Sequence, residues 1–140
     1  MKARFLAARL LGYLWATPST LASVLGFLLP MWALQQLRPR CWRAGAWEWS
    51  VVEGSRFWRA YSLRGWSATT LGWCIFFSPL ADRAENVAVH ERRHVAQNLV
   101  LGPLFLPLYA ALWLVFGYRQ HPLEVDARRV EANSSAVAHE

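Results

Sequence analysis

A stretch of twenty residues without a charged side chain, residues 99–118, constrains the fold of this chain more than any other feature. A straight helix of that length would measure about 30 Å, the thickness of the hydrocarbon core of a membrane. However, Gly102-Pro103 and Pro107 interrupt the stretch, and proline inside a helix kinks or ends it. The interruptions predict a helical hairpin that runs out to about Leu101 and returns along residues 108–117.

The segment before this stretch carries two histidines four residues apart, His90 and His94, with Glu91 directly after the first. On a helix, predicted over residues 82–101, both imidazoles lie on one face and can bind one ion. Neutral imidazole suits Zn²⁺, which lowers the pKa of a bound water to about 7. Glu91 then lies beside the open coordination position as a general base. The alternative is a polar helix whose histidines are surface or capping groups.

The third zinc ligand must come from elsewhere, and Glu124 is the best-placed carboxylate. Pro122 suits the first position of a last helix and fixes Glu124 in its first turn, whereas Glu131 lies near a polar tail, residues 134–140. A single straight span would place Glu124 and the histidines on opposite sides of a membrane, so the zinc hypothesis requires the hairpin. An ion pair with Arg128 is the alternative role for Glu124.

Three further residues are candidates for supporting the metal ligands. A metal-bound histidine usually donates its other ring N–H to a carboxylate or carbonyl, and Asp126 can accept it. Gln97 follows the motif on the same helix and can hold the neighbouring backbone. His121 precedes Glu124 by three residues and could act as a ligand or as a donor to the transition state. In the simpler alternative, Asp126 is a solvated helix residue and His121 a loop histidine.

Residues 46–77 are rich in aromatic and β-branched side chains and are interrupted by glycines. This composition predicts three short strands, near residues 47–52, 57–61 and 68–77, in a small antiparallel sheet. The last strand lies just before the motif helix. An exposed edge there could pair with an extended peptide beside the metal, whereas an internal strand would only pack.

The first part of the chain, residues 1–37, is apolar and suits association with a membrane. The dipeptide Thr17-Pro18 suits the cap and first position of a helix, predicted over residues 18–36 with a kink at Pro30. Residues 3–15 predict an amphipathic helix. Its basic residues, able to meet lipid headgroups, are Lys2, Arg4 and Arg9. A buried core helix is the alternative interpretation of this segment.

Composition favours a membrane surface over nucleic acid as the partner of this basic chain. Of its 140 residues, 55% are hydrophobic and nine are tryptophan, more than a soluble core of this size needs. The net charge is +6, but the arginines flank apolar segments, form no continuous stripe and belong to no nucleic-acid-binding motif. They occur on both sides of the first apolar segment, so the positive-inside rule assigns no orientation.

The two cysteines, Cys41 and Cys74, fit no thiolate metal site and no CxxC redox motif. We expect two free, buried thiols, since a disulfide would need an oxidising compartment. The length of the chain suits one domain, residues 1–140.

With HExxH and Glu124 in place, the chain resembles the zincin-type metallopeptidases, specifically the gluzincins. In that group a glutamate on a later helix completes HExxH. The segment LEVDARR is similar to the Glu-x-x-Ala segment of membrane-associated members, with Glu124 and Ala127 matching. Where an aspartate often follows the alanine, this chain has Arg128.

The chain also resembles a group of small uncharacterised bacterial membrane proteins, over most of residues 12–130. Their shared motifs read here as LWATPST, TTLGW, HERRHVAQ, GPLFLPLY and HPLE. The resemblance implies a location at the bacterial inner membrane and supports the pairing of HExxH with Glu124. It implies no substrate.

The sequence therefore predicts an α+β fold in which an N-terminal apolar helix and a small sheet precede the HExxH helix, the hairpin and a short C-terminal helix. The leading hypothesis is a membrane-associated zinc metallopeptidase that acts on peptides or proteins. His90, His94 and Glu124 would bind zinc and Glu91 would be the base. The alternatives are a zinc-stabilised membrane scaffold or binding protein without catalysis, with His121 as a fourth ligand, and a membrane protein without metal.

Overall fold

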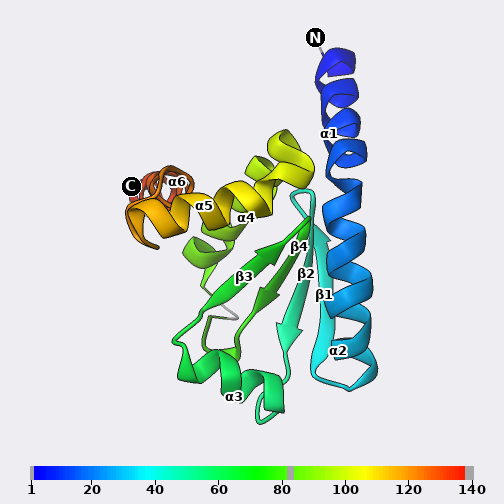
Figure 1. Ribbon diagram of the computed structural model, residues 1–140, viewed down its shortest axis with the longest axis vertical. Helices are drawn as coiled ribbons and strands as arrows, with labels where there is room; N and C mark the ends of the chain where they lie inside the picture. The colour runs from blue at the N-terminus through cyan, green and yellow to red at the C-terminus, as the bar shows by residue number, and fades with distance from the viewer. Residues whose placement is uncertain (1, 82–83, 138–140) are drawn as a thin grey trace.

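A computed structural model describes residues 2–81 and 84–137, and it has the α+β fold that the sequence predicts (Figure 1). The chain begins with α1 (Lys2–Ser23), the π-helix η1 (Val24–Leu28) and α2 (Leu29–Ala33). The strands are β1 (Leu37–Arg43), β2 (Ala46–Val51), β3 (Ala68–Leu71) and β4 (Cys74–Phe77), with α3 (Arg56–Leu63) between β2 and β3. The second half holds η2 (Pro79–Ala81), α4 (Glu85–Leu101), η3 (Gly102–Leu104), α5 (Phe105–Phe116) and α6 (Pro122–Val137).

The sheet separates two apolar clusters, because successive side chains of a strand point to opposite faces. On β4, Cys74 and Phe76 pack in one cluster with Leu28 of η1. The alternate residues, Ile75 and Phe77, pack in the other cluster with Ala88 of α4. The sheet thus holds α4, the helix with both histidines, on the face opposite η1.

The sheet is mixed, with strand order β1-β2-β4-β3, so the prediction of an antiparallel sheet was wrong. The β1–β2 and β3–β4 pairs are antiparallel, but β2 and β4 are parallel. Parallel neighbours need a crossover connection, and α3 lies in that connection. The aromatic run at residues 57–61, predicted as a strand, belongs to α3. The hydroxyl of Ser55 accepts a bond from the backbone N–H of Trp58 at 3.0 Å, which stabilises the first turn of this helix.

Residues 68–77 form a hairpin of two strands and not the single strand that the sequence predicted. The pair Leu71 and Cys74 closes a two-residue loop that starts with Gly72. Gly72 has a φ of +62°, which the first loop position of a tight hairpin requires and which glycine adopts without strain. The hairpin leaves β3 at the edge of the sheet.

The predicted helix boundary at Thr17-Pro18 was wrong, because α1 continues through both residues to Ser23. The hydroxyl of Thr17 donates to the carbonyl of Tyr13 at 2.8 Å instead of capping a new helix. The irregularity predicted at Pro30 lies just before it, in the π-helix η1. The side chains of residues 2–5, including Lys2 and Arg4, lie outside the described part of the structure.

The predicted hairpin is confirmed: α4 ends at Leu101, η3 turns the chain, and α5 returns across α4 (Figure 1). The predicted start of the motif helix, Asp82, lies outside the described residues, and α4 begins at Glu85. The last helix is longer than expected, since α6 includes residues 134–137 of the predicted tail. Residues 138–140 lie outside the described part.

Both cysteines are free, and only Cys74 is buried. Burial raises the pKa of the Cys74 thiol to about 12. The expectation of a second buried thiol was wrong because Cys41 lies on the edge strand β1, where it is exposed.

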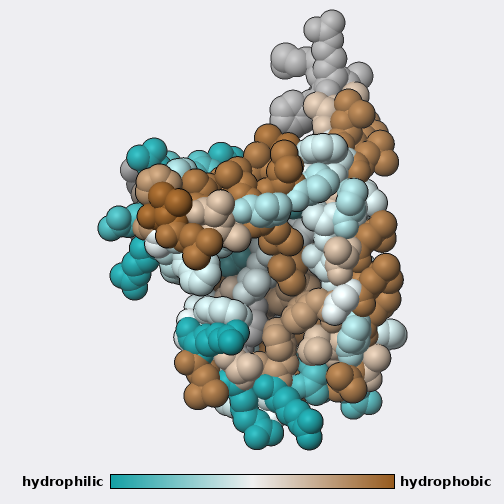
Figure 2. Space-filling view, viewed as in Figure 1, coloured by the Kyte–Doolittle hydropathy of each residue, from teal (hydrophilic) through white to brown (hydrophobic). Residues whose placement is uncertain are grey.

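Large apolar surfaces remain exposed along α1 and α5 (Figure 2). Two segments, Leu6–Ala33 and Glu85–Phe116, are long and apolar enough to cross a membrane by length and composition. The second segment folds back on itself at η3 and is therefore not one straight span.

The turn at η3 depends on a glycine, which provides a test of the hairpin. Gly102 has a φ of +57°, and a Cβ atom there would lie 2.3 Å from Nε1 of Trp15. We expect Gly102→Ala to destabilise the fold by about 1–3 kcal/mol, because both the backbone and the indole would have to shift. Thermal unfolding in detergent, followed by tryptophan fluorescence, measures the loss.

Gly26→Ala is the matched control, because no atom lies within 4 Å of its added Cβ and its φ is not positive. It should leave the melting temperature unchanged or raise it slightly. Equal melting temperatures for the two variants would contradict the close packing of α1 on η3.

Candidate metal centre

His90 and His94 lie one turn apart on the same face of α4, as the spacing predicts. Their Nε2 atoms are 3.2 Å apart and their rings pack edge to face. His94 is buried and His90 is partly buried. The packing of α4 on the sheet therefore points both nitrogens toward one small volume.

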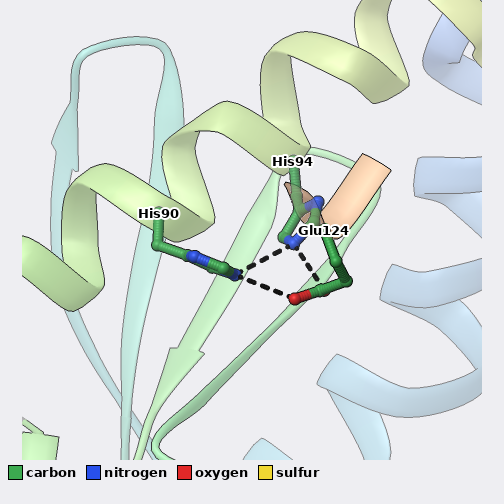
Figure 3. A group of neighbouring side chains, drawn as sticks. All are labelled: His90, His94 and Glu124. Carbon is green, nitrogen blue, oxygen red and sulfur yellow. Dashed lines mark hydrogen bonds and ion pairs between the residues drawn. The ribbon is translucent and has the colours of Figure 1, made fainter. Parts of the chain in front are cut away.

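Glu124 lies in the first turn of α6, two residues after Pro122, and its side chain is 1% exposed. Its Oε1 lies 3.0 Å from Nε2 of His94, and its Oε2 lies 3.6 Å from Nε2 of His90 (Figure 3). The hairpin thus returns the predicted third ligand to the two histidines.

The spacing of these three side chains fits a zinc ion. One donor atom from each residue lies within 4.8 Å of the others. Among the described residues, this is the one cluster of histidine, cysteine or carboxylate side chains with such spacing. Tetrahedral zinc with bonds of 2.0–2.1 Å places its ligand atoms about 3.3 Å apart, close to the 3.2 Å between the two Nε2 atoms. The carboxylate of Glu124 places Oε1 at 3.0 Å from one of these nitrogens and Oε2 at 3.6 Å from the other. Two imidazoles and one carboxylate also form the donor set of catalytic zinc sites that keep one position open.

The charge state of Glu124 suits a metal ligand. Burial raises its pKa, but hydrogen bonds from His90, His94 and Tyr109 outweigh burial and hold the pKa well below its usual range. Burial likewise opposes protonation of His90, yet the contact with Glu124 and the nearby carboxylates raise the pKa of this histidine above its ordinary value.

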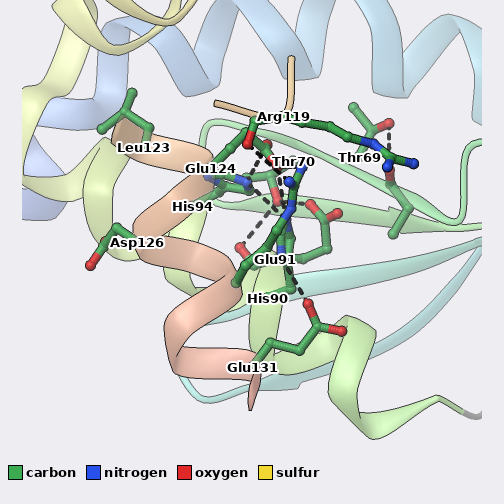
Figure 4. A network of polar contacts seen from close by, with 12 residues as sticks. Thr69, Thr70, His90, Glu91, His94, Arg119, Leu123, Glu124, Asp126 and Glu131 are labelled. Atoms are coloured by element: carbon green, nitrogen blue, oxygen red, sulfur yellow. Dashed lines mark hydrogen bonds and ion pairs between the residues drawn. The ribbon is translucent and has the colours of Figure 1, made fainter. Parts of the chain in front are cut away.

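Glu91, the predicted general base, is buried beside the three ligand residues and lines the same cavity. The hydroxyl of Thr70, on the edge strand β3, donates to its Oε2 at 2.6 Å (Figure 4). Burial raises the pKa of Glu91, and the Thr70 hydrogen bond only partly opposes this. The sequence analysis did not single out Thr70, since only the register of the hairpin places it opposite α4.

Gln97, predicted to hold the neighbouring backbone, contacts His94 directly. Its Oε1 lies 2.9 Å from Nδ1 of His94, while its Nε2 donates to Leu123 and Asp126. Because the amide oxygen can only accept, Nδ1 of His94 carries the proton and Nε2 is left free for a metal. Asp126 touches no histidine; it accepts bonds from Arg93 at 2.6 and 3.1 Å and holds Gln97.

Glu131 orients His90, a role that the sequence analysis missed by placing this residue near the tail. Its Oε2 lies 3.1 Å from Nδ1 of His90, and its Oε1 accepts a bond from Asn86 (Figure 4). Glu131 follows Glu124 by seven residues, two helical turns, so both face α4. That spacing was the available signal in the sequence.

Two more side chains contact Glu124. The hydroxyl of Tyr109 donates to Oε1 at 2.8 Å, and Nη2 of Arg128 donates to Oε2 at 3.0 Å. The ion pair considered as an alternative role for Glu124 is thus present together with the histidine contacts. Arg128 also donates to the carbonyl of Arg119, which joins α6 to the preceding loop.

His121 is fully buried but lies outside the three-residue ligand group. Its ring packs edge to face on Tyr109, with centroids 4.5 Å apart, and burial lowers its pKa. Neither ring nitrogen has a hydrogen-bond partner among the described residues. The contact that the structure gives His121 is therefore with the ring of Tyr109.

A cavity of about 770 Å³ opens beside the ligands. Its walls come from β3, from α5 and from the loop before β3, and it contains His90, Glu91, His94 and Glu124. The edge of β3 therefore borders the metal centre, the arrangement that peptide pairing would require.

Comparison with protein-family models, curated proteins and solved structures finds no match to this chain.

The three-residue ligand set predicts that zinc binding depends on Glu124. Glu124→Gln removes the negative charge between the histidines, so purified protein should lose most of its bound zinc, measured by elemental analysis after dialysis. Glu53→Gln makes the same chemical change on an exposed turn and should retain wild-type zinc. Equal zinc in the two variants would contradict the site.

Glu131 should affect zinc affinity without abolishing binding. Removing the partner of a metal-bound histidine typically weakens affinity by about 10–100-fold, so Glu131→Gln should lower it within this range. Competition with a coloured zinc chelator measures the change. An affinity equal to that of Glu53→Gln would show that Glu131 does not orient His90.

Proposed function

We propose that this chain is a membrane-associated zinc metallopeptidase, with His90, His94 and Glu124 as metal ligands and Glu91 as general base. The convergence of these ligands on one volume, beside a buried carboxylate, carries the proposal. Ligands and base come from two helices that only the hairpin brings together. Glu131, Gln97 and Thr70 each orient one of these side chains.

In the reaction, one water is added across a peptide bond, which yields a carboxylate and an amine. Zinc supplies a Lewis acid that makes water a stronger acid and polarises a carbonyl oxygen. Glu91 accepts the proton of the attacking water at its carboxylate and passes it to the leaving nitrogen. Thr70 holds this carboxylate in place through the hydrogen bond to Oε2.

The cavity supports a hydrolytic centre in preference to a closed zinc scaffold. Structural zinc sites have four protein ligands and no open position, whereas here three donors border about 770 Å³ of space. The edge strand β3 lies along this space, where its backbone can pair with an extended peptide. His121, which would have to close the site as a fourth ligand, packs edge to face against Tyr109 and lies outside the three-residue group.

Association with a membrane is supported by the N-terminal helices. The segment Leu6–Ala33 is long and apolar enough to cross a bilayer, and it exposes leucine and tryptophan side chains along its length. Arg38 follows it at the start of β1, where its exposed side chain can meet lipid phosphates. The family resemblance suggests the bacterial inner membrane as the location.

The test of the mechanism is Glu91→Gln. The variant should bind zinc as the wild type does and lose hydrolysis by about 10²–10⁴-fold, because the amide cannot accept the proton. The assay follows cleavage of a fluorogenic peptide mixture by protein in detergent micelles, with zinc content measured on the same sample.

Glu85→Gln is the matched control, since Glu85 lies on the same helix but is exposed and pairs with Arg92. It should retain both zinc and activity. Undiminished cleavage by Glu91→Gln would contradict the mechanism. A wild-type protein that binds zinc but cleaves no peptide would instead favour the scaffold.

A further inference from the structure

Helix α5 has two apolar faces, one toward the metal centre and one away from the protein. Phe105, Tyr109 and Trp113 recur every four residues and line the cavity. On the opposite side, Leu114 and Val115 are 79% and 73% exposed. No residue of α5 is charged. The helix α5 therefore separates the metal centre from the outside of the protein by a single layer of apolar side chains on each face.

The outer face of α5 continues onto its neighbouring elements. Val100 at the end of α4 and Leu104 in η3 are 77% and 61% exposed. Figure 2 shows that apolar side chains also cover the surface along α1, on the other side of η3. An extended apolar surface of this kind fits the hydrocarbon of a lipid bilayer, which accepts apolar side chains of any shape.

The mouth of the cavity carries a tryptophan–arginine pair. In the loop before β3, the guanidinium of Arg64 lies 4.9 Å from the ring centre of Trp66, and both residues line the cavity. Tryptophan and arginine are the side chains that settle at a membrane–water boundary, with rings toward the apolar side and charges toward water. The cavity thus extends from an apolar helix to a side-chain pair suited to the headgroup level.

From this arrangement we propose that the cavity takes an extended, apolar segment of a polypeptide that resides in a lipid bilayer. The segment would pair its backbone with the edge of β3 and place apolar side chains against Leu106 and Trp113 of α5. The inference rests on the proposed function, because the segment is the substrate of the same metal centre. Its new content is the substrate class and its source in the bilayer.

The experiment measures binding, using zinc-loaded Glu91→Gln protein in vesicles of phosphatidylethanolamine and phosphatidylglycerol. One probe is a leucine-rich peptide with a photo-crosslinking group, which partitions into the vesicles. The other is a peptide of equal length with serine and lysine in place of leucine, which stays in water. We expect the apolar probe to crosslink to α5 and β3, and the polar probe to crosslink to neither.

The contribution of α5 is tested by a pair of neighbouring residues. Trp113→Ala removes part of the cavity wall and should weaken binding of the apolar probe by about tenfold. Leu114→Ala changes the opposite face of the same helix and should leave probe binding unchanged. Leu106→Ala, a smaller change on the cavity side, should also weaken binding. If Trp113→Ala binds no zinc and therefore has not folded, the comparison of Leu106→Ala with Leu114→Ala still tests the inference.

Equal binding of the two probes would overturn the inference, as would equal effects of Leu106→Ala and Leu114→Ala. Failure of the proposed function gives a different result. If the apolar probe binds at α5 but the wild-type enzyme with zinc leaves it uncut, the peptidase proposal fails and the binding site stands. If the wild type cuts only the polar peptide, the peptidase stands and the substrate class is wrong.

Discussion

The arrangement of the second half of the chain depends on a buried, ionised carboxylate, Glu124. An unpaired charge in a site that is 1% exposed would cost several kcal/mol. Here both oxygens have partners, since Oε1 contacts His94 and Tyr109 and Oε2 contacts His90 and Arg128. These partners come from α4, α5 and α6, so the position of the charge is compatible with only one packing of the three helices.

The helices reach that packing because polar contacts run continuously from α4 to α6. Arg93 binds Asp126, Asp126 binds Gln97, and Gln97 binds both His94 and the backbone of Leu123. A second contact joins the helices through Glu131 and His90. The two histidines thus each face, at Nδ1, an oxygen atom that can only accept, which leaves both Nε2 atoms available. The hydrogen bonds that orient the two histidine rings therefore also hold α4 against α6.

The sequence predicted the proximity of the two histidines and the hairpin because both follow from short-range rules. Helical spacing places His90 beside His94, and Gly102-Pro103 prevents a straight helix. Features that depend on tertiary context were missed. The aromatic residues of α3 are compatible with a strand or a helix. They form a helix here, in the crossover connection that the parallel strands β2 and β4 require. Glu131 was set aside because it lies near the polar tail, although its spacing of seven residues from Glu124 places both on one face of a helix.

The length of α5 explains why the metal centre and the apolar surface belong together. Twelve residues of helix measure about 18 Å, which is too short to cross a hydrocarbon core of about 30 Å. A longer, straight helix could have been covered by lipid on all sides, but it would have carried Glu124 away from the histidines. A short return helix can instead expose one face and turn the other toward the two histidines and Glu124. The interruption at η3 therefore both brings Glu124 to the histidines and places an exposed apolar surface beside the cavity.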